Sequence, residues 1–304
     1  MRKTVCATLA VMMSVLFSPL SQAGQAWESY KARFFKPEGR IVDTGNGGVS
    51  HTEGQGFAML MAVANDDKAT FDKLWQWTNR ELKNKENGLF YWRYNPAESN
   101  PVADKNNAAD GDVLIAWALL KADARWHDKR YSAASDAITK ALVAHSVIRY
   151  AGYRVMLPGV QGFKLDGEAI LNPSYFVFPA WQAFAGRSHL PVWRDLIKDG
   201  KRLLGKMGSG KADLPADWVS LASDGKLEPA KGWPPRMSYD AIRIPLYLAW
   251  SDKQSPLLTP WKAWFGQFPR EQTPAWVNVT TNEYAPYMME GGLLAVRDLT
   301  MGQS

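Results

Sequence analysis

Three short stretches of the chain each place a carboxylate immediately before an apolar pattern with helical spacing. They carry Glu53, the pair Asp110 and Asp112, and Asp240. Acids held at the ends of rigid helices suit hydrolysis of a glycosidic bond. In that reaction one carboxylic acid protonates the leaving oxygen, and one carboxylate handles a water or the anomeric carbon. The chain also contains 14 Trp, 11 Tyr and 12 Phe, and aromatic rings pack against the apolar faces of sugars.

Two of the first three acids, Glu53 and Asp112, also have a simpler structural explanation. An acid such as Glu53 at a helix N-terminus is stabilised by the helix dipole, although Gly54 and Gly56 beside it would let the backbone approach a ligand closely. Asp112 could cap a helix. One residue is enough for a cap, so Asp110 has no structural reason to be a second acid. Calcium binding is disfavoured, because the further oxygen ligands of an EF-hand loop are missing.

The last acid, Asp240, lies three residues before Arg243. If a helix begins near Ser238, the two side chains share one face of it. An ordinary surface ion pair would contribute little to stability, but the neighbouring residues are apolar, among them Ile242 and Leu246. We therefore expect this helix end to be recessed.

Most of the tryptophans lie in apolar helical patterns, which predicts that they belong to the core. Examples are Trp75, Trp117 and Trp250. Trp92 instead lies in a turn-rich segment and is the better candidate for a platform that stacks on a sugar ring. Tyr175 also lies where a loop leads into a helical pattern, and we expect it to contact the substrate.

Other kinds of site are not supported by the sequence. The four histidines, at positions 51, 127, 145 and 189, form no pair with metal-ligand spacing, and no serine has a Gly-x-Ser-x-Gly context. A Gly-rich phosphate loop is also missing from the sequence. We expect neither a metal nor a cofactor. The net charge of +6 is spread among acids without a dense basic run, which disfavours nucleic acid as a partner.

The N-terminus has the pattern of a secretory signal peptide. Arg2 and Lys3 precede an apolar run over residues 5–17, and Ser21-Gln22-Ala23 is a small-x-small cleavage site. The run is too short to cross a bilayer, so a membrane anchor is the weaker alternative. We expect residues 1–23 to be removed and the protein to be secreted or periplasmic. The single cysteine, Cys6, lies in this segment, so the mature chain would have no disulfide.

Helical periodicity dominates the remainder, residues 24–304, and persuasive strand patterns are few. No Pro- or Ser-rich linker divides it, which favours one domain. Pairs of helices joined by irregular, aromatic-rich segments suggest a ring of helices around a core, with function on the loop face. The predicted helices cover residues 54–64, 69–82, 112–126, 131–147, 175–185, 191–207, 238–250, 257–265 and 293–299.

Taken together, four ordered motifs resemble those of glycoside hydrolase family 8. Residues 53–58 (Glu-Gly-Gln-Gly-Phe-Ala) are similar to its Glu-Gly-Gln-Ser-Tyr-Gly motif, and residues 109–112 (Ala-Asp-Gly-Asp) to its Ala-Ser/Thr-Asp-Gly/Ala-Asp signature. Residues 239–243 meet its Tyr-Asp-Ala-x-Arg motif in full, and residues 172–175 match an Asn-Pro-Ser-Tyr segment. The likeness is greatest to the bacterial endoglucanases of the family, including the periplasmic cellulase of cellulose-synthesis operons.

The resemblance implies an all-α fold, an (α/α)6 barrel, and an inverting mechanism. It implies Glu53 as general acid and Asp240 as general base for the attacking water. Asp110 would bind and distort the sugar at the cleavage subsite, since a nucleophile is inconsistent with inversion. The further residues expected to bind substrate are Asp112, Trp92, Tyr175, Tyr239 and Arg243.

The activity that the resemblance implies is hydrolysis of internal β-1,4-glucosidic bonds in cellulose by a monomeric protein. One alternative is the same machinery acting on xylan, chitosan or mixed-linkage glucan, although the mildly basic chain slightly disfavours cationic chitosan. Another is a non-catalytic, glycan-binding component of an envelope assembly. Retention of Glu53, Asp110 and Asp240 argues against it, because binding alone requires no separate acid and base.

The chain departs from the family pattern in three places. Ala109 replaces a Ser or Thr before Asp110, and residues 56–58 (Gly-Phe-Ala) replace Ser-Tyr-Gly. The chain also ends soon after Asp298, where relatives continue into a last helix. We therefore expect a barrel that lacks its closing helix and exposes apolar surface there.

Overall fold

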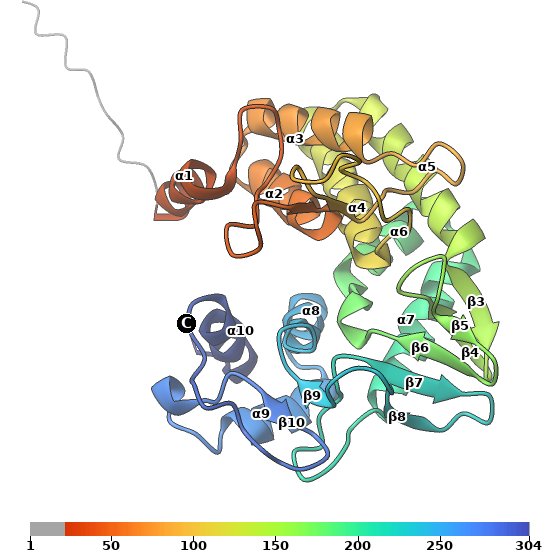
Figure 1. Cartoon of the computed structure of the whole chain (residues 1–304), viewed down its shortest axis with the longest axis vertical. Helices are drawn as coiled ribbons and strands as arrows, with labels where there is room; N and C mark the ends of the chain where they lie inside the picture. The colour runs from red at the N-terminus through yellow and green to blue at the C-terminus, as the bar shows by residue number, and fades with distance from the viewer. Residues whose placement is uncertain (1–21, 304) are drawn as a thin grey trace, which may run out of the picture.

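The computed structural model describes residues 22–303. The predicted signal peptide, residues 1–23, lies outside this part except for its last two residues, which begin the first helix. Helices dominate the described chain (Figure 1). They are α1 (Gln22–Phe34), α2 (Thr52–Ala64), α3 (Lys68–Glu81), α4 (Ala109–Trp126), α5 (Lys129–His145), α6 (Phe178–Ser188), α7 (Pro191–Leu204), α8 (Arg243–Ser251), α9 (Thr259–Phe265) and α10 (Gly292–Met301).

The helices form two concentric layers. In the inner layer, α2 contacts α4, α4 contacts α6, α6 contacts α8, and α8 contacts α10. In the outer layer, α3 packs on α2, α5 on α4, α7 on α6, and α9 on α10. Figure 1 shows the pairs following one another around an arc, with α1 and α10 at its two ends. The predicted ring of helix pairs is therefore present in the described residues.

Each predicted helix has a counterpart among α2 to α10, but three of them begin three or more residues from the predicted start. α6 begins at Phe178, three residues after its predicted start, and Tyr175 instead ends a short 3₁₀ turn. α4 begins at Ala109, three residues before its predicted start, so Asp110 and Asp112 both lie in its first turn. α8 begins at Arg243, five residues after its predicted start. Its Pro245 therefore falls in the first turn, where the missing N–H of proline costs no helical hydrogen bond. Asp240 lies in the turn before the helix rather than within it.

The strands are short and belong to the connections between helices. β1 (Ser50–His51) pairs with β2 (Arg93–Tyr94), β3 (Val147–Tyr150) with β4 (Tyr153–Met156), and β9 (Arg236–Met237) with β10 (Val277–Asn278), all antiparallel. An antiparallel sheet has the order β5 (Lys164–Leu165), β6 (Glu168–Leu171), β7 (Val219–Ala222), β8 (Leu227–Pro229). Strands of two to four residues are too short to show an alternating pattern, so the sequence did not reveal them. Short 3₁₀ turns occupy Pro173–Tyr175, Pro256–Leu258 and Arg270–Gln272.

One continuous apolar core joins the layers, from Trp27 in α1 to Met289 before α10. Its largest fully buried side chains include Trp181, Trp193 and Trp264, and each contributes through the apolar area that it removes from water. The prediction that Trp250 is a core residue is wrong, because this ring is 49 % exposed at the end of α8. No helix among residues 22–303 has the length and apolarity to cross a membrane.

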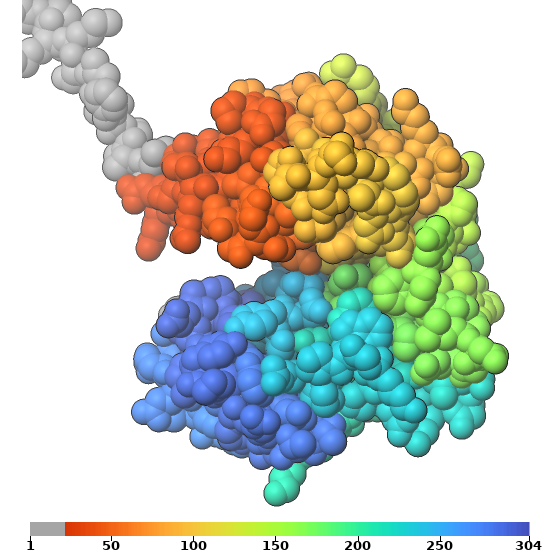
Figure 2. Space-filling model, in the orientation of Figure 1, coloured from red at the N-terminus to blue at the C-terminus, as the bar shows by residue number. Residues whose placement is uncertain are grey.

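A hollow runs between the two halves of the molecule. Figure 2 shows it between the segment containing α1 to α4 and the segment containing α8 to α10, open on the side of α1 and α10. α10 is only partly covered there. Its fully buried residues are Arg297 and Thr300, whereas five apolar side chains remain half-buried, namely Leu293, Leu294, Val296, Leu299 and Met301.

Candidate active site

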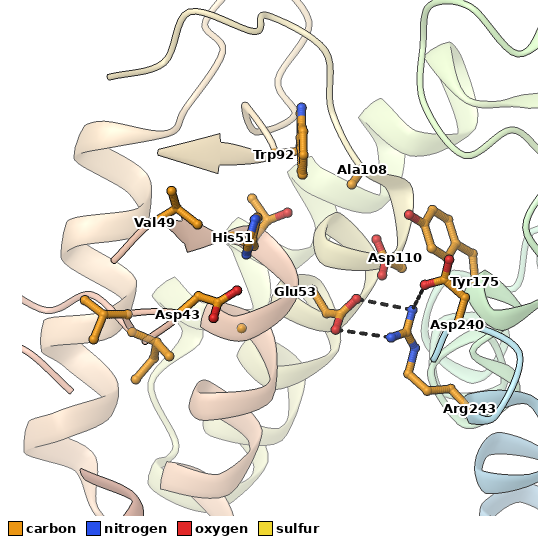
Figure 3. Close-up of a pocket in the computed structure, with 14 residues that line it drawn as sticks. Asp43, Val49, His51, Glu53, Trp92, Ala108, Asp110, Tyr175, Asp240 and Arg243 are labelled. Atoms are coloured by element: carbon orange, nitrogen blue, oxygen red, sulfur yellow. Dashed lines mark hydrogen bonds and ion pairs between the residues drawn. The ribbon is translucent and has the colours of Figure 1, made fainter. Parts of the chain in front are cut away.

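The three motif acids meet in one cavity. Glu53 in the first turn of α2, Asp110 in the first turn of α4, and Asp240 before α8 line a space of about 440 Å³ together with Arg243. Figure 3 shows their side chains converging from three directions. Helix N-termini place these acids at the same end of neighbouring inner helices, which is why residues nearly 190 positions apart come together.

Two glycines allow the N-terminal ends of α2 and α4 to approach closely. A Cβ at Gly56 would lie 2.5 Å from the nearest side-chain atom of α4, and a Cβ at Gly111 would overlap the side chain of Thr52. The sequence had suggested that Gly56 makes room for a ligand; instead it makes room for the other helix. The tight crossing is what brings Glu53 beside Asp110.

Arg243 lies between the acids on opposite sides of the cavity. Its Nη2 is 3.3 Å from Oε2 of Glu53 and donates to Oδ1 of Asp240 at 3.0 Å (Figure 3). The side chains of Glu53 and Asp240 remain 36 % and 33 % exposed, against 17 % for Arg243. One buried guanidinium therefore holds the two carboxylates apart while both still reach the cavity.

The segment 172–175 supports the same corner of the site. Asn172 donates from Nδ2 to Oδ2 of Asp240 at 3.3 Å, and Ser174 accepts from Nη2 of Arg243 at 3.2 Å. Ser174 also donates from its hydroxyl to Oδ1 of Asn172 at 2.6 Å. Tyr175 lines the cavity; burial, followed by the nearby charges of Asp110 and Asp240, raises the pKa of its hydroxyl well above the ordinary value.

Buried Asp110, beside Glu53, retains a proton more readily than a free acid. Burial raises the pKa of Asp110 well above its ordinary value, and the charge of Glu53 and a side-chain hydrogen bond to it act in the same direction. Arg243 and the backbone N–H of Gly111 oppose them. Burial also disfavours the Arg243 cation, but the surrounding carboxylates outweigh it and raise the pKa of this guanidinium. The arrangement thus places a carboxyl that favours its protonated form beside Glu53, which Arg243 contacts.

Trp92 forms part of the rim. Its ring lines the cavity and stacks on His51, with centroids 5.5 Å apart and planes at 17°. Its indole N–H donates to Oδ2 of Asp104 at 2.7 Å, which fixes the ring orientation. Burial lowers the pKa of His51, although Asp43 and Glu53 act in the opposite direction. A neutral imidazole beneath the indole leaves this rim largely apolar.

Two of the expected substrate-binding residues do not line this cavity. Asp112 is fully buried, accepts from the backbone N–H of Phe90 at 3.1 Å, and accepts from Nδ2 of Asn107 at 2.8 Å. It thereby ties α4 to the segments on either side of Trp92. Tyr239 is 52 % exposed and lines a neighbouring hollow, where its hydroxyl lies 2.9 Å from that of Tyr287.

The environment of Asp112 predicts a pH dependence of folding. Burial raises its pKa from 3.8 to about 7, against the effect of Asn107 and Phe90. The folded state therefore keeps a proton that the unfolded chain releases, so this side chain stabilises the fold least at high pH. The wild-type free energy of unfolding, relative to Asp112→Asn, should fall by about 4 kcal/mol from pH 4 to pH 7. Urea titrations across this range measure it. Asp224→Asn, at an exposed turn, is the control. A pH-independent difference would contradict the prediction.

Sequence reasoning missed several residues at the site. Asp43 and His51 line the cavity, and Asn172 and Ser174 bind the Asp240–Arg243 pair. The 172–175 motif was a usable signal, whereas nothing local distinguishes Asp43. Within residues 22–303, no three His, Cys, Asp or Glu side chains gather as metal ligands.

Comparison with known proteins agrees with this geometry. The profile of the family "Glycosyl hydrolases family 8" matches residues 1–304. An endoglucanase of Cellulomonas uda is 64% identical over 96% of this chain and 82% of its own length. The crystal structure of a GH8 endo-beta-1,4-glucanase from an Achatina fulica gut metagenomic library has a TM-score of 0.92 and 67% identity, covering 94% of this chain and 91% of that one.

A second solved structure, endoglucanase Cel10 from Klebsiella pneumoniae, has a TM-score of 0.91 and 67% identity, and the match covers 92% of this chain and 90% of that one. Likeness over almost the whole fold identifies the two helical layers as the (α/α)6 barrel. Among residues 22–303 the barrel is represented by five inner helices and by four outer helices that pack on them. Since the profile, the sequence identity and the shared fold agree, the chain belongs to glycoside hydrolase family 8.

Proposed function

We propose that this protein is an endo-β-1,4-glucanase that hydrolyses internal bonds of cellulose by an inverting acid/base mechanism. The observation that carries the proposal is the convergence of Glu53, Asp110 and Asp240 on one cavity around Arg243. The names of the similar proteins described above support the substrate class. No cofactor is required, because the reaction needs only a proton donor, a base and water.

In this proposal, Glu53 donates a proton to the leaving oxygen and Asp240 takes one from the attacking water. An inverting pair needs room for that water, with the two carboxyl groups roughly 6.5–9.5 Å apart. The guanidinium of Arg243 between the two groups supports such a spacing. Substrate entry would exchange bonds to Arg243 for bonds to the sugar and the water.

Asp110 serves two purposes in this scheme. Its buried carboxyl favours the protonated form and hydrogen-bonds to Glu53, so Asp110 can keep a proton beside the group that is proposed to donate one. It also lies at the floor of the cavity, where it would hold the distorted sugar, and hydrogen bonds to such a sugar strengthen in the transition state.

The hollow supports an endo mode of action. Cleavage inside a long chain requires a groove that lets the polymer pass on both sides of the acids, and the hollow in Figure 2 opens at the side of α1 and α10. Trp92 and Tyr175 at the cavity, and Tyr239 beside it, would supply aromatic contacts along the glucan. Arg243 and Asp112 would act by orienting the acids and the segments around Trp92.

Release of reducing sugar from carboxymethyl-cellulose, xylan and chitosan tests the substrate. We expect turnover on carboxymethyl-cellulose and little on the other two. Faster hydrolysis of xylan, chitosan or mixed-linkage glucan would mean that the same mechanism acts on a glycan other than cellulose. Oligosaccharide binding without hydrolysis of any glycan would support the non-catalytic alternative. The anomeric form of the first product, followed by NMR, separates inversion from retention.

We also propose that residues 24–304 form a single catalytic domain, exported to the periplasm or the medium after removal of residues 1–23, and monomeric. The continuous core supports a single domain, and the charged n-region with its apolar run supports export.

Trp92→Ala should weaken binding of long cello-oligosaccharides several-fold. Stacking of an indole on a sugar would contribute on the order of 1 kcal/mol, by analogy with aromatic pairs. Calorimetric titration measures the affinity, and a thermal melt measures stability. If Trp92 served mainly as core, the change would instead cost roughly 3–5 kcal/mol of stability and leave the affinity of the folded fraction unchanged.

Trp250→Ala is the matched control for this change. Trp250 is also a partly exposed tryptophan, but it lies at the opposite end of α8 from Arg243 and packs on Trp117, with ring centroids 5.0 Å apart. The affinity for oligosaccharides should not change in this variant.

A further inference from the structure

We propose that Asp217 is a positioning residue for the base Asp240, acting by clamping the backbone of the turn that carries it. This inference rests on the proposed function, since it assigns Asp217 to the same reaction. Asp217 does not line the cavity and belongs to none of the family-like motifs in the sequence. It lies two residues before β7, 23 positions from Asp240.

One carboxylate oxygen of Asp217 holds both sides of the catalytic turn. Its Oδ1 accepts from the backbone N–H of Ser238 at 2.9 Å and from the backbone N–H of Ala241 at 2.7 Å. The two residues between these amides are Tyr239 and Asp240. Bonds from N–H to a carboxylate are roughly twice as strong as bonds between neutral groups, so the clamp restrains the backbone on either side of the base.

The clamp itself is anchored to rigid structure. The backbone N–H of Asp217 donates to the carbonyl of Arg236 in β9 at 2.8 Å, and the carbonyl of the next residue, Trp218, accepts from Ala230 at 2.9 Å. Immediately after that, β7 pairs with β6 and β8. Asp217 therefore connects the four-stranded sheet to the start of α8.

The turn needs such an anchor because the side-chain contacts of Asp240 are exchangeable. Its carboxylate is bound by Arg243 and Asn172, and both Asp240 and Arg243 line the cavity that water and sugar must enter. α8 begins only at Arg243, so Asp240 lies in a turn whose own backbone bonds are few: its carbonyl accepts from the N–H of Arg243 at 3.0 Å, and the carbonyl of Ser238 accepts from the N–H of Ile242 at 3.0 Å. The Asp217 clamp keeps the backbone in place while those side-chain bonds change partner.

Burial supports this assignment. Burial raises the pKa of Asp217, and the charge of Asp240 acts in the same direction, while the N–H groups of Ala241 and Ser238 oppose them. An acid kept in such a place without a cation beside it is costly. The buried position of Asp217 is explained by its two hydrogen bonds, because without this carboxylate the N–H groups of Ser238 and Ala241 would lose their acceptor.

Asp217→Ala and Asp217→Asn test the proposal. We expect Asp217→Ala to lower kcat roughly 10²-fold, as for a displacement of about 1 Å of a catalytic group, with KM and oligosaccharide affinity near the wild-type values. Asp217→Asn keeps an amide oxygen as acceptor and should recover most of kcat. Turnover is expressed per binding-competent molecule, counted by titration, so that a loss of folded protein does not register as a loss of catalysis.

Asp224→Ala is the matched control, because Oδ1 of Asp224 also accepts a backbone N–H, from Lys226 at 3.0 Å, but at the exposed β7–β8 turn. A wild-type kcat per competent molecule in Asp217→Ala would overturn the proposal.

Hydrogen exchange at the amides of Ser238 and Ala241 gives a second readout, independent of activity. It should accelerate in Asp217→Ala, and unchanged exchange would also overturn the proposal. An inactive wild type would refute the proposed function, while exchange would still decide whether the clamp exists.

Discussion

Glu53→Gln should lower turnover on carboxymethyl-cellulose by roughly 10²–10⁴-fold, the usual contribution of a general acid. Glutamine keeps the shape of the side chain and an acceptor for Arg243, which donates to Oε1 of Glu53 at 3.4 Å, but it has no acidic proton for the leaving oxygen. The affinity for cello-oligosaccharides should therefore change little. Initial rates, with binding measured by calorimetry, test both parts.

The leaving group offers a sharper test of the role of Glu53. A glucoside with an acidic phenol as leaving group needs little protonation, so Glu53→Gln should lose much less activity on it than on cellulose. Glu283→Gln, at an exposed position away from the cavity, should behave as wild type on both substrates. Nearly full activity of Glu53→Gln on carboxymethyl-cellulose would mean that another group is the acid.

Asp240→Asn should be comparably inactive, because the attacking water would lose its base. Asparagine still offers an oxygen to Arg243 and fits the same turn, so stability should be close to that of wild type. Added azide should restore activity, since this anion attacks the anomeric carbon without giving up a proton. The product should be a glycosyl azide of inverted configuration, which NMR identifies.

Azide also distinguishes the role of Glu53 from that of Asp240. It should not restore turnover of Glu53→Gln on cellulose, because the leaving oxygen would still lack its proton. Asp252→Asn is the control for Asp240, as Asp252 lies at the other end of α8 and accepts only the backbone N–H of Gln254, at 2.9 Å. Azide rescue of Glu53→Gln without rescue of Asp240→Asn would reverse the assignment of acid and base.

The joint environment of the acids explains why neither role can be read from one residue alone. Asp110 retains a proton more readily than a free acid, because burial and Glu53 both disfavour its ionised form. Arg243 contacts both Glu53 and Asp240. A site with one cation among three acids can hold one mobile proton and one free base at the same time, which is the state that acid/base hydrolysis requires.

Much of the fold was predictable because helical periodicity is a local property. Apolar residues at spacings of three and four mark the buried face of each helix, and α2 to α10 were all anticipated in this way. The helix N-terminal positions of Glu53 and Asp110 follow from the same pattern, and so does their presence on one face of the ring. The spacing of three residues between Asp240 and Arg243 also predicted that these two side chains lie on one face.

Contacts between distant residues were decided only by the tertiary structure. Asp110 and Asp112 are two residues apart in the first turn of one helix, so their side chains point in roughly opposite directions. Asp110 faces the cavity, and Asp112 is buried against Asn107. Trp117 and Trp250 both lie in apolar helical patterns, but the end of α8 leaves Trp250 half in solvent.

The way in which the backbone around Asp240 is held also depended on the tertiary structure. The sequence alone identified Asp240 as a candidate from its neighbours, and it predicted a helix around it. In the folded chain the helix begins only at Arg243. The turn before it is held by Asp217, through two hydrogen bonds that span more than 20 residues. Local spacing determines which residues can carry the chemistry, because it sets secondary structure; packing across the ring decides which of them meet, because such contacts leave no period in the sequence.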